Sequence, residues 1–227
     1  MNTRGISILS VLVVVIVVCA GGFFYLAPKK SDNPSRTLLA SHPELYTYYD
    51  EAIAAQKDIA SNGSIAQPYL HVGLEWATIG SITKDPVWYQ AALRVYQQAD
   101  AALQGKNSVI LLNLADTQTQ LGQYNDAKNT LERTIALTPG DATVYSTLID
   151  LLRYKSKASP DEILAVYAEG IKRVLGAGEL FIERAAYLRD IGRFADARAD
   201  YEAAHKGGAL SDQAYASALK ELSAAQK

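Results

Sequence analysis

Residues 108–141, SVILLNLADTQTQLGQYNDAKNTLERTIALTPGD, decide the fold of this chain. The stretch holds two runs of apolar residues, which are separated by Gly122 and closed by Pro139. Residues three and four positions apart lie on one face of a helix. This spacing is met by Leu111, Leu114 and Ala115 in the first run, and by Ala127 and Leu131 in the second. The stretch therefore predicts two helices joined by a short turn.

The pattern of the second helix recurs along the chain. Its first small or apolar position is occupied by Ala92, Ala127, Ile163 and Ala197, in steps of 35, 36 and 34 residues. Four residues later come Tyr96, Leu131, Tyr167 and Tyr201, and three residues after those come Ala99, Thr134, Gly170 and Ala204. A period near 34 is typical of repeated helix–turn–helix units, which bury their apolar faces only by stacking on one another.

We therefore expect an all-α fold, an α-solenoid. Its four repeats are placed at 68–106, 107–141, 142–177 and 178–210. A capping helix over 211–226 follows, with Ser211 as its expected N-cap. The third repeat is irregular, because its second helix resumes two residues late at Ile163, and 156–160 is expected to form a lengthened turn.

These repeats resemble the tetratricopeptide repeat (TPR) family. The family pattern is Trp-x-x-Leu-Gly-x-x-Tyr on the first helix, then Ala, an aromatic residue and a closing Pro on the second. Trp76, Ile79 and Gly80 fit this pattern closely in the first repeat. The chain departs from it at Gln104, where the closing proline is absent, and at Arg184, which occupies a Leu position. The resemblance extends from about Pro68 to the C-terminus and implies a protein-binding function.

The N-terminus differs in composition from the repeats. Residues 6–27 form an uncharged apolar run of 22 residues, which as a helix spans roughly 33 Å and is long enough to cross a bilayer. Arg4 precedes the run and Lys29–Lys30 follow it. We expect residues 1–27 to be an uncleaved single-pass transmembrane anchor, so that the chain resembles membrane-anchored bacterial TPR proteins. A cleaved signal peptide and a lipidated Cys19 are the alternatives.

Orientation in the membrane rests on weaker signals. A plain count of flanking lysines and arginines favours a cytoplasmic repeat domain. A short basic tail before one apolar run instead resembles a bacterial signal-anchor, and on that ground the soluble domain is expected to be extracytoplasmic. Residues 28–40 are expected to be a juxtamembrane linker. An extra capping helix and turn is expected over 41–67, started by a Ser41–Glu44 capping box and ended at Asn62-Gly63.

Composition excludes several classes of function. The net charge of −2 lacks the basic stripe of a nucleic-acid binder. Cys19 is the single cysteine, so no intrachain disulfide or thiolate metal site can form. His42, His71 and His205 have no His, Cys or paired acid at ligand spacing, and no phosphate-binding glycine loop or Gly-x-Ser-x-Gly motif is present. The chain is therefore not expected to be an enzyme or to bind a metal or cofactor.

The family resemblance implies a concave groove lined by first-helix residues that point away from the second helices. By helical phase, the expected partner-binding residues are Asn113, Asp116, Gln120, Asp150, Arg153, Glu183 and Arg189. The amide of Asn113 is expected to pair with a peptide backbone, because it both donates and accepts. Positions that carry lysine and arginine in carboxylate-clamp members of the family are here Ala77, Ser81, Thr143 and Thr147, so such a clamp is not expected.

The expected function is a membrane-tethered scaffold for protein–protein interaction, with a protein or peptide as partner. Two alternatives remain. A chaperone-like holder of exported unfolded chains would need an apolar groove, to which Val109, Leu112 and Ile182 could contribute. Self-association into a homo-oligomer is the second, because short repeat arrays often stack on one another.

Overall fold

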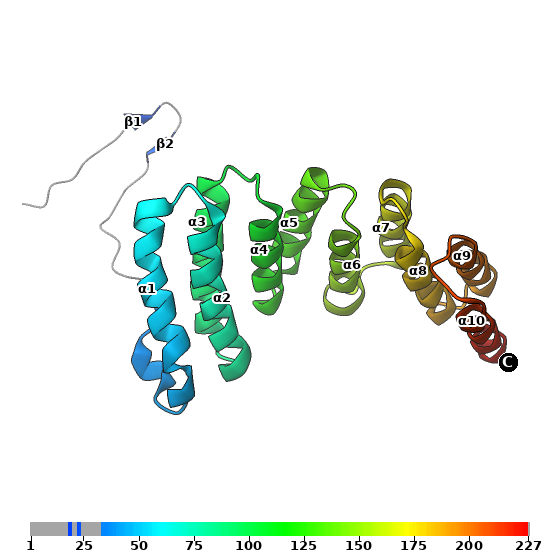
Figure 1. Cartoon of the computed structure of the whole chain (residues 1–227), viewed down its shortest axis with the longest axis horizontal. Coiled ribbons are helices and arrows are strands. Elements are labelled where there is room, and N and C mark those ends of the chain that lie inside the picture. The colour runs from blue at the N-terminus through cyan, green and yellow to red at the C-terminus, as the bar shows by residue number, and fades with distance from the viewer. Residues whose placement is uncertain (1–17, 20–21, 24–32, 227) are drawn as a thin grey trace, which may run out of the picture. The chain divides into compact units, whose positions relative to one another are not determined.

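The computed structural model describes residues 18–19, 22–23 and 33–226 (Figure 1). The chain divides into two compact units, Met1–Asn33 and Pro34–Lys227. The second of these, called the helical body below, contains all the helices that the structure describes. We treat each unit by itself.

The N-terminal unit contains two very short strands. β1 (Val18–Cys19) pairs antiparallel with β2 (Gly22–Phe23), with Val18 opposite Phe23 and Cys19 opposite Gly22. These four residues fall within the transmembrane helix expected over 6–27, so the expectation of helix is wrong for them. β-branched valine favours extended backbone, and the sequence reasoning gave this no weight. The rest of the expected anchor lies outside the described residues. Among the residues that are described, no helix is both long and apolar enough to span a membrane.

The helical body consists of consecutive helices in which each packs against the next (Figure 1). Two 3-10 turns, η1 (Arg36–Leu39) and η2 (Pro43–Leu45), lead into α1 (Tyr46–Asn62). The helices that follow are α2 (Ala66–Thr83), α3 (Pro86–Ala102), α4 (Ser108–Gln120), α5 (Tyr124–Leu137), α6 (Ala142–Asp150) with the π-helical turn η3 (Leu151–Lys155), α7 (Pro160–Arg173), α8 (Gly178–Asp190), α9 (Phe194–Lys206) and α10 (Asp212–Ala225). The pairs α2/α3, α4/α5, α6–η3/α7 and α8/α9 are the four helix pairs of a solenoid.

Side-chain caps and glycines set where these helices begin and end. Asn107 accepts a hydrogen bond from the backbone N–H of Ile110 at the start of α4. Ser211, the N-cap predicted from the sequence, accepts one from the N–H of Ala214 at the start of α10. Between α4 and α5 the chain turns at Gly122, whose φ of 73° favours glycine. Gly192 has a φ of 78° at the same place between α8 and α9. Equivalent turns therefore use the same residue type.

The repeat positions found in the sequence form the core. All twelve small, apolar or aromatic positions of the second helices are buried. In the first repeat, the rings of Trp76 and Trp88 stack with centroids 5.7 Å apart. Small residues allow close approach: a Cβ atom on Gly73 would overlap the ring of Tyr96, and one on Gly170 would lie 2.9 Å from atoms of Tyr145 and Leu180. The all-α solenoid predicted from the 34-residue period is thus confirmed.

The segment before the first repeat differs from its prediction. Leu39 is fully buried in the first core cluster, so residues 36–39 belong to the helical body and not to a linker over 28–40. Burial of apolar surface favours docking this leucine over leaving it in a solvated linker. Ser41 does not cap a helix as expected. Instead Pro43 begins the turn η2, α1 starts at Tyr46, and Glu44 pairs with His42 at 3.1 Å. The predicted end at Asn62-Gly63 is confirmed.

The irregularity of the third repeat has a local cause. Its first helix passes from α-helical to π-helical hydrogen bonding at Leu151 and ends at Lys155. A π turn accommodates an extra residue within a helix. Lys157 then takes a φ of 54°, and Ser159 caps α7 by accepting from the N–H of Glu162. The lengthened turn predicted over 156–160 is confirmed, while the π turn before it was not foreseen.

Candidate partner-binding surface

The first helices of the last repeats are linked side by side through polar contacts. Ser146 on α6 donates to the carboxylate of Glu183 on α8, and Arg153 on η3 lies 3.4 Å from Asp190 on α8. We call the side of the helical body that carries these contacts the first-helix face. Second helices are linked by their own pairs, Asp100 with Arg133 and Lys128 with Glu162. Each link joins one repeat to the next.

A group of polar and aromatic residues meets on the first-helix face at the π turn. The central cluster, as we call it, consists of Ser146, Arg153, Glu183, Tyr187 and Asp190. The guanidinium carbon of Arg153 lies 4.7 Å from the ring centroid of Tyr187, which is a cation–π distance. Two of these residues, Arg153 and Glu183, were predicted from helical phase. Tyr187 and Asp190 were missed, although they follow Glu183 by four and seven residues and so share its helical face.

Burial makes Glu183 costly to ionise. Desolvation raises the pKa of its carboxyl group, and the nearby carboxylates of Asp150 and Glu179 raise it further. The hydrogen bond from Ser146 and the charge of Arg153 act in the opposite direction. Burial likewise raises the pKa of the Tyr167 hydroxyl, beneath the cluster, to about 12, with Arg153 opposing the shift. Asp190 is paired with both Arg153 and Arg189, so Glu183 is the acid of the cluster whose charged form a further donor or cation would stabilise.

One exposed aromatic ring borders the central cluster. Tyr154 belongs to the same π turn, its ring centroid lies 4.9 Å from the guanidinium carbon of Arg153, and the residue is 62% exposed. Aromatic residues and arginine are enriched where proteins bind one another. Asp150, one residue before the π turn, is exposed as well. The arrangement offers an exposed acid and an exposed ring four residues apart, with the half-buried carboxylate of Glu183 on the neighbouring helix α8.

The predicted residues on α4 lie differently. The side-chain amide of Asn113 donates to the backbone carbonyl of Val109 at 2.8 Å, and its oxygen lies 3.5 Å from the Tyr96 hydroxyl. It therefore already has partners, unlike the free peptide-binding amide that we expected, because the carbonyl four residues earlier is within reach on a helix. Asp116 is exposed and accepts from Gln120 at 3.3 Å. The hydrogen bonds described for these residues run within α4 and to Tyr96 of α3, apart from the central cluster.

Arg189, the last predicted residue, lies at the C-terminal end of the same face. Its guanidinium group pairs with Asp190 at 3.0 Å and with Glu221 of α10 at 3.4 Å. It thereby connects the fourth repeat to the capping helix. The central cluster and Arg189 therefore share Asp190 as a common partner, while Asp116 and Gln120 remain a separate polar pair on α4.

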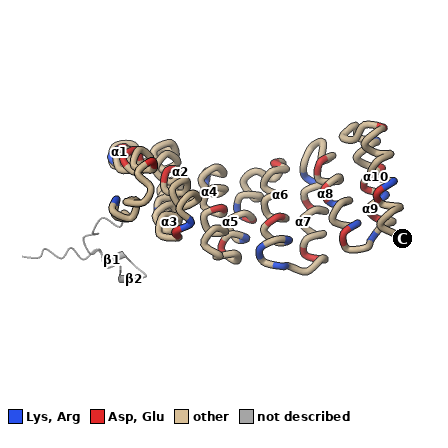
Figure 2. The backbone as a smooth tube through the Cα atoms, turned by 90° about the horizontal axis from the view of Figure 1, so that it is seen from below, with Lys and Arg blue, Asp and Glu red and all other residues tan. Residues whose placement is uncertain are grey.

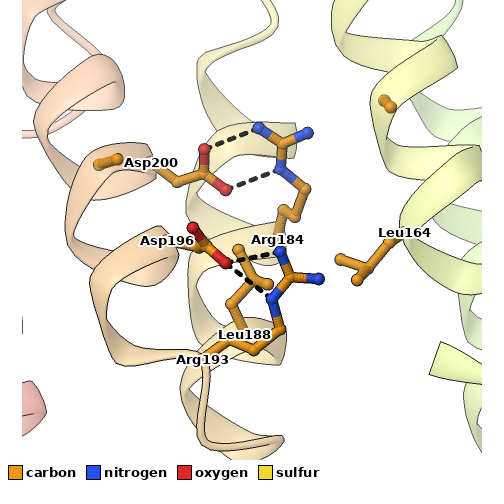
Figure 3. Close-up of a pocket in the computed structure, with 8 residues that line it drawn as sticks. Leu164, Arg184, Leu188, Arg193, Asp196 and Asp200 are labelled. Carbon is orange, nitrogen blue, oxygen red and sulfur yellow. Dashed lines mark hydrogen bonds and ion pairs between the residues drawn. The ribbon is translucent and has the colours of Figure 1, made fainter. Parts of the chain in front are cut away.

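A shallow pocket of about 350 Å³ lies between α7, α8 and α9, with Leu164 and Leu188 in its wall (Figure 3). Its charges are already paired. Arg184 donates twice to Asp200, at 2.7 Å each, and Arg193 binds Asp196 at its edge. Sequence analysis noted Arg184 only as a departure from a Leu position and missed its partner sixteen residues later. The pocket is built by structural ion pairs and offers no free charge for a ligand.

One group of possible metal ligands is present among the described residues. Glu51 of α1 and His71 and Glu75 of α2 have ligand atoms within 4.8 Å of one another. The expectation that His71 lacks a nearby acid is therefore wrong. Glu75 follows it by four residues, a spacing that places both side chains on one helical face. Charges elsewhere are mixed: Figure 2 shows acidic and basic residues interspersed along the helical body.

Comparison with known proteins agrees with the repeat architecture. A family model described as tetratricopeptide repeat matches residues 89–152. No curated protein sequence matches the chain. Among solved structures, MamA is similar with a TM-score of 0.53 and 15% identity, over 69% of this chain and 86% of MamA. YrrB, described as a TPR protein with an unusual peptide-binding site, has a TM-score of 0.52 and 18% identity, over 81% of this chain and 88% of YrrB.

At these identities the structural likeness concerns the fold. The family match adds sequence evidence, because residues 89–152 include most of the second helix of the first repeat, the whole second repeat and most of the first helix of the third. The buried repeat positions extend the same pattern through α9. These observations together identify tetratricopeptide repeats over residues 89–152 and the same helix-pair architecture in the rest of the four-repeat array.

Proposed function

We propose that this protein is a membrane-tethered scaffold that binds a partner protein or peptide on its first-helix face, at the central cluster. Tetratricopeptide repeats serve protein–protein interaction, and the site consists of groups suited to recognition. The observation that carries the proposal is Glu183, a half-buried carboxylate whose pKa is raised by burial and by neighbouring acids. A further donor from a partner, in addition to the hydroxyl of Ser146, would stabilise the charged form of this carboxyl group.

The chemistry of the central cluster favours a partner segment that brings a lysine, an arginine or backbone N–H groups. Such a group would approach Glu183 and the exposed Asp150, while an apolar part of the segment packs on the ring of Tyr154. YrrB gives this proposal a precedent within the fold, because it is described as having a peptide-binding site. A helix or an extended segment would suit the surface.

The tether is the apolar run over 6–27, with the helical body in the extracytoplasmic space. What supports it is the length of the run and the absence of charge within it. Tethering would hold the scaffold at the membrane and limit its partners to envelope proteins that reach it. The remaining predicted groove residues, Asn113, Asp116, Gln120 and Arg189, would border a longer segment.

The test is affinity purification of the full-length chain from its own membranes in mild detergent, followed by mass spectrometry. The site variant combines Asp150→Lys with Tyr154→Ala, both at exposed positions that the fold does not bury. The matched control combines Glu132→Lys on α5 with Tyr48→Ala on α1, which make the same two changes at other exposed positions. Both variants should keep the helical circular dichroism of the parent chain.

We expect one abundant partner that is lost from the site variant and kept by the control. A partner kept by both would exclude binding at Asp150 and Tyr154, the exposed residues beside the central cluster. Many weakly bound chains would favour the chaperone-like alternative. Copies of the same chain, recovered with a differently tagged version, would favour self-association.

A further inference from the structure

The structure brings three metal-binding side chains together at the packed pair α1 and α2, away from the central cluster. His71 and Glu75 are one helical turn apart on α2, with His71 Nε2 3.7 Å from Glu75 Oε1. Glu51 reaches them from α1, and one ligand atom from each residue lies within 4.8 Å of the other two. Two ligands from one helix and a third from its neighbour is a common way to build a metal site between helices.

Glu75 has a feature that an ordinary surface acid lacks. Its Oε2 atom is inaccessible to solvent and has no hydrogen-bond partner among the described residues. A buried polar atom without a partner costs about 1–3 kcal/mol, and more when it carries charge. A positive ion between the three side chains would stabilise the charged form of the Glu75 carboxyl group.

The ligand atoms, one imidazole nitrogen and two carboxylates, restrict which metal ions the site would bind. Imidazole nitrogen favours Zn²⁺, Cu²⁺, Ni²⁺ and Fe²⁺, whereas Mg²⁺ and Ca²⁺ favour sites built from oxygen alone. Zn²⁺ binds imidazole and carboxylate at about 2.0–2.2 Å, which sets tetrahedral ligand atoms roughly 3.4 Å apart. Moving from 4.8 Å to this distance needs only small side-chain rotations, and the exposed Glu51 and His71 can make them. Three protein ligands leave a fourth position for water or for a group of a partner.

We propose that Glu51, His71 and Glu75 bind one divalent transition-metal ion of the Zn²⁺ class, which joins α1 to α2. The ion strengthens the start of the solenoid, where the segment before the first repeat packs on it. This site is independent of the partner-binding function proposed above, because it lies on other helices and uses none of the same residues.

The experiment titrates Zn²⁺ into the full-length chain, purified in mild detergent without a histidine tag and stripped with EDTA. Calorimetry gives the stoichiometry and affinity for Zn²⁺, and visible absorption of added Co²⁺ reports on the ligands. The site variants are His71→Ala and Glu75→Gln, the second nearly equal in shape to the native residue. The control is His42→Ala, because His42 also pairs with a glutamate at 3.1 Å but has no third ligand.

We expect one Zn²⁺ per chain, a melting temperature raised by Zn²⁺ and not by Mg²⁺, and a loss of affinity of about tenfold or more in both site variants. The His42→Ala chain should bind as the parent does. Equal Zn²⁺ binding by the parent and His71→Ala chains would overturn the proposal, as would binding lost only in His42→Ala. A Glu75→Gln chain that keeps its helical spectrum without metal excludes misfolding as the reason for lost binding.

Discussion

The hydroxyl of Ser146 donates to the carboxylate of Glu183, at 3.0 and 3.1 Å, across 37 residues of sequence. Arg153 and Asp190 are also 37 residues apart and also in contact. A shared separation means that one register of α6–η3 against α8 satisfies both pairs. The contacts on the first-helix face therefore depend on how the third and fourth repeats stack. Breaking one pair should also weaken the other, because both need the same register.

The first prediction concerns the charge of Glu183. A carboxyl group whose folded pKa is raised stabilises the fold below its unfolded pKa of about 4.3, and this contribution is lost as pH rises through the folded pKa. Glu183→Gln keeps an oxygen that accepts from Ser146 and removes the ionisation. The variant should therefore be more stable than the parent at pH 7.5, with the difference shrinking toward pH 4.

Urea unfolding of residues 28–227 at both pH values measures this difference. Glu132→Gln, at an exposed position on α5, is the matched control and should show little change. If Glu183→Gln were less stable than the parent at pH 7.5, the charged hydrogen bond with Ser146 would outweigh the desolvation of the carboxylate, contrary to our expectation.

A second prediction compares the two ion pairs of Figure 3. The side chains of Arg184 and Asp200 are 21% and 8% exposed, while those of Arg193 and Asp196 are 51% and 52% exposed. Removing one partner of a buried pair leaves a charge without compensation and costs about 3–5 kcal/mol, whereas exposed pairs contribute about 0–1 kcal/mol. Asp200→Ala should therefore destabilise residues 28–227 strongly and Asp196→Ala little, as measured by urea unfolding.

The family pattern supplies the control for this pair. Arg184 stands at a Leu position of the TPR motif, so Arg184→Leu combined with Asp200→Ala replaces the ion pair with apolar contacts. Such replacements are often neutral or stabilising. The double variant should recover most of the stability that Asp200→Ala loses. A double variant as unstable as the single one would show that Asp200 acts through something other than Arg184.

The sequence predicted the fold well and the candidate site in part, for physical reasons. Positions such as Ala92 and Tyr96 repeat because each helix pair must bury the same face, so periodicity alone finds them. Helical phase also places Arg153 and Glu183 on one side of the first helices, and the structure brings both into the central cluster. It does not say what a side chain touches, and so the internal bonds of Asn113 could not be foreseen.

The remaining differences lie where the chain departs from regular helix or where two helices meet. Arg153 contacts the ring of Tyr187 from within the π turn at Leu151–Lys155. A change of hydrogen-bond type within a helix leaves no simple mark in the sequence. Glu51 approaches His71 from α1. This contact could not be predicted from the sequence, because it depends on how α1 packs on α2. The neighbour Glu75, in contrast, was visible four residues after His71 and was overlooked.

A third prediction tests the close approach of α2 and α3. Gly73 faces the ring of Tyr96, and an added Cβ would overlap it. Gly73→Ala should therefore destabilise the protein even though alanine favours a helix by about 1 kcal/mol, because overpacking costs about 1–3 kcal/mol. Gly140→Ala is the control, since a Cβ there meets nothing within 4 Å.

Urea unfolding measures how much Gly73→Ala and the control Gly140→Ala each change the free energy of unfolding. Repeating Gly73→Ala in a Tyr96→Leu background shows whether the tyrosine ring is responsible for the loss of stability. In that background Gly73→Ala should cost less, since the overlapping ring is gone. An equal cost in both backgrounds would assign the effect to another contact of α2.

The last prediction concerns the N-terminus and separates its three interpretations. An apolar run over 6–27 that spans the bilayer should keep the full-length chain in the membrane through carbonate extraction, whereas residues 28–227 should be soluble without detergent and strongly helical by circular dichroism. Ile16→Arg, a charge near the middle of the run, should weaken membrane retention. Intact mass spectrometry of the mature chain distinguishes the alternatives, because signal cleavage removes about twenty residues and lipidation adds mass at Cys19. A full-length chain of unmodified mass that is released by carbonate would contradict the anchor, and the scaffold would then act without a membrane tether.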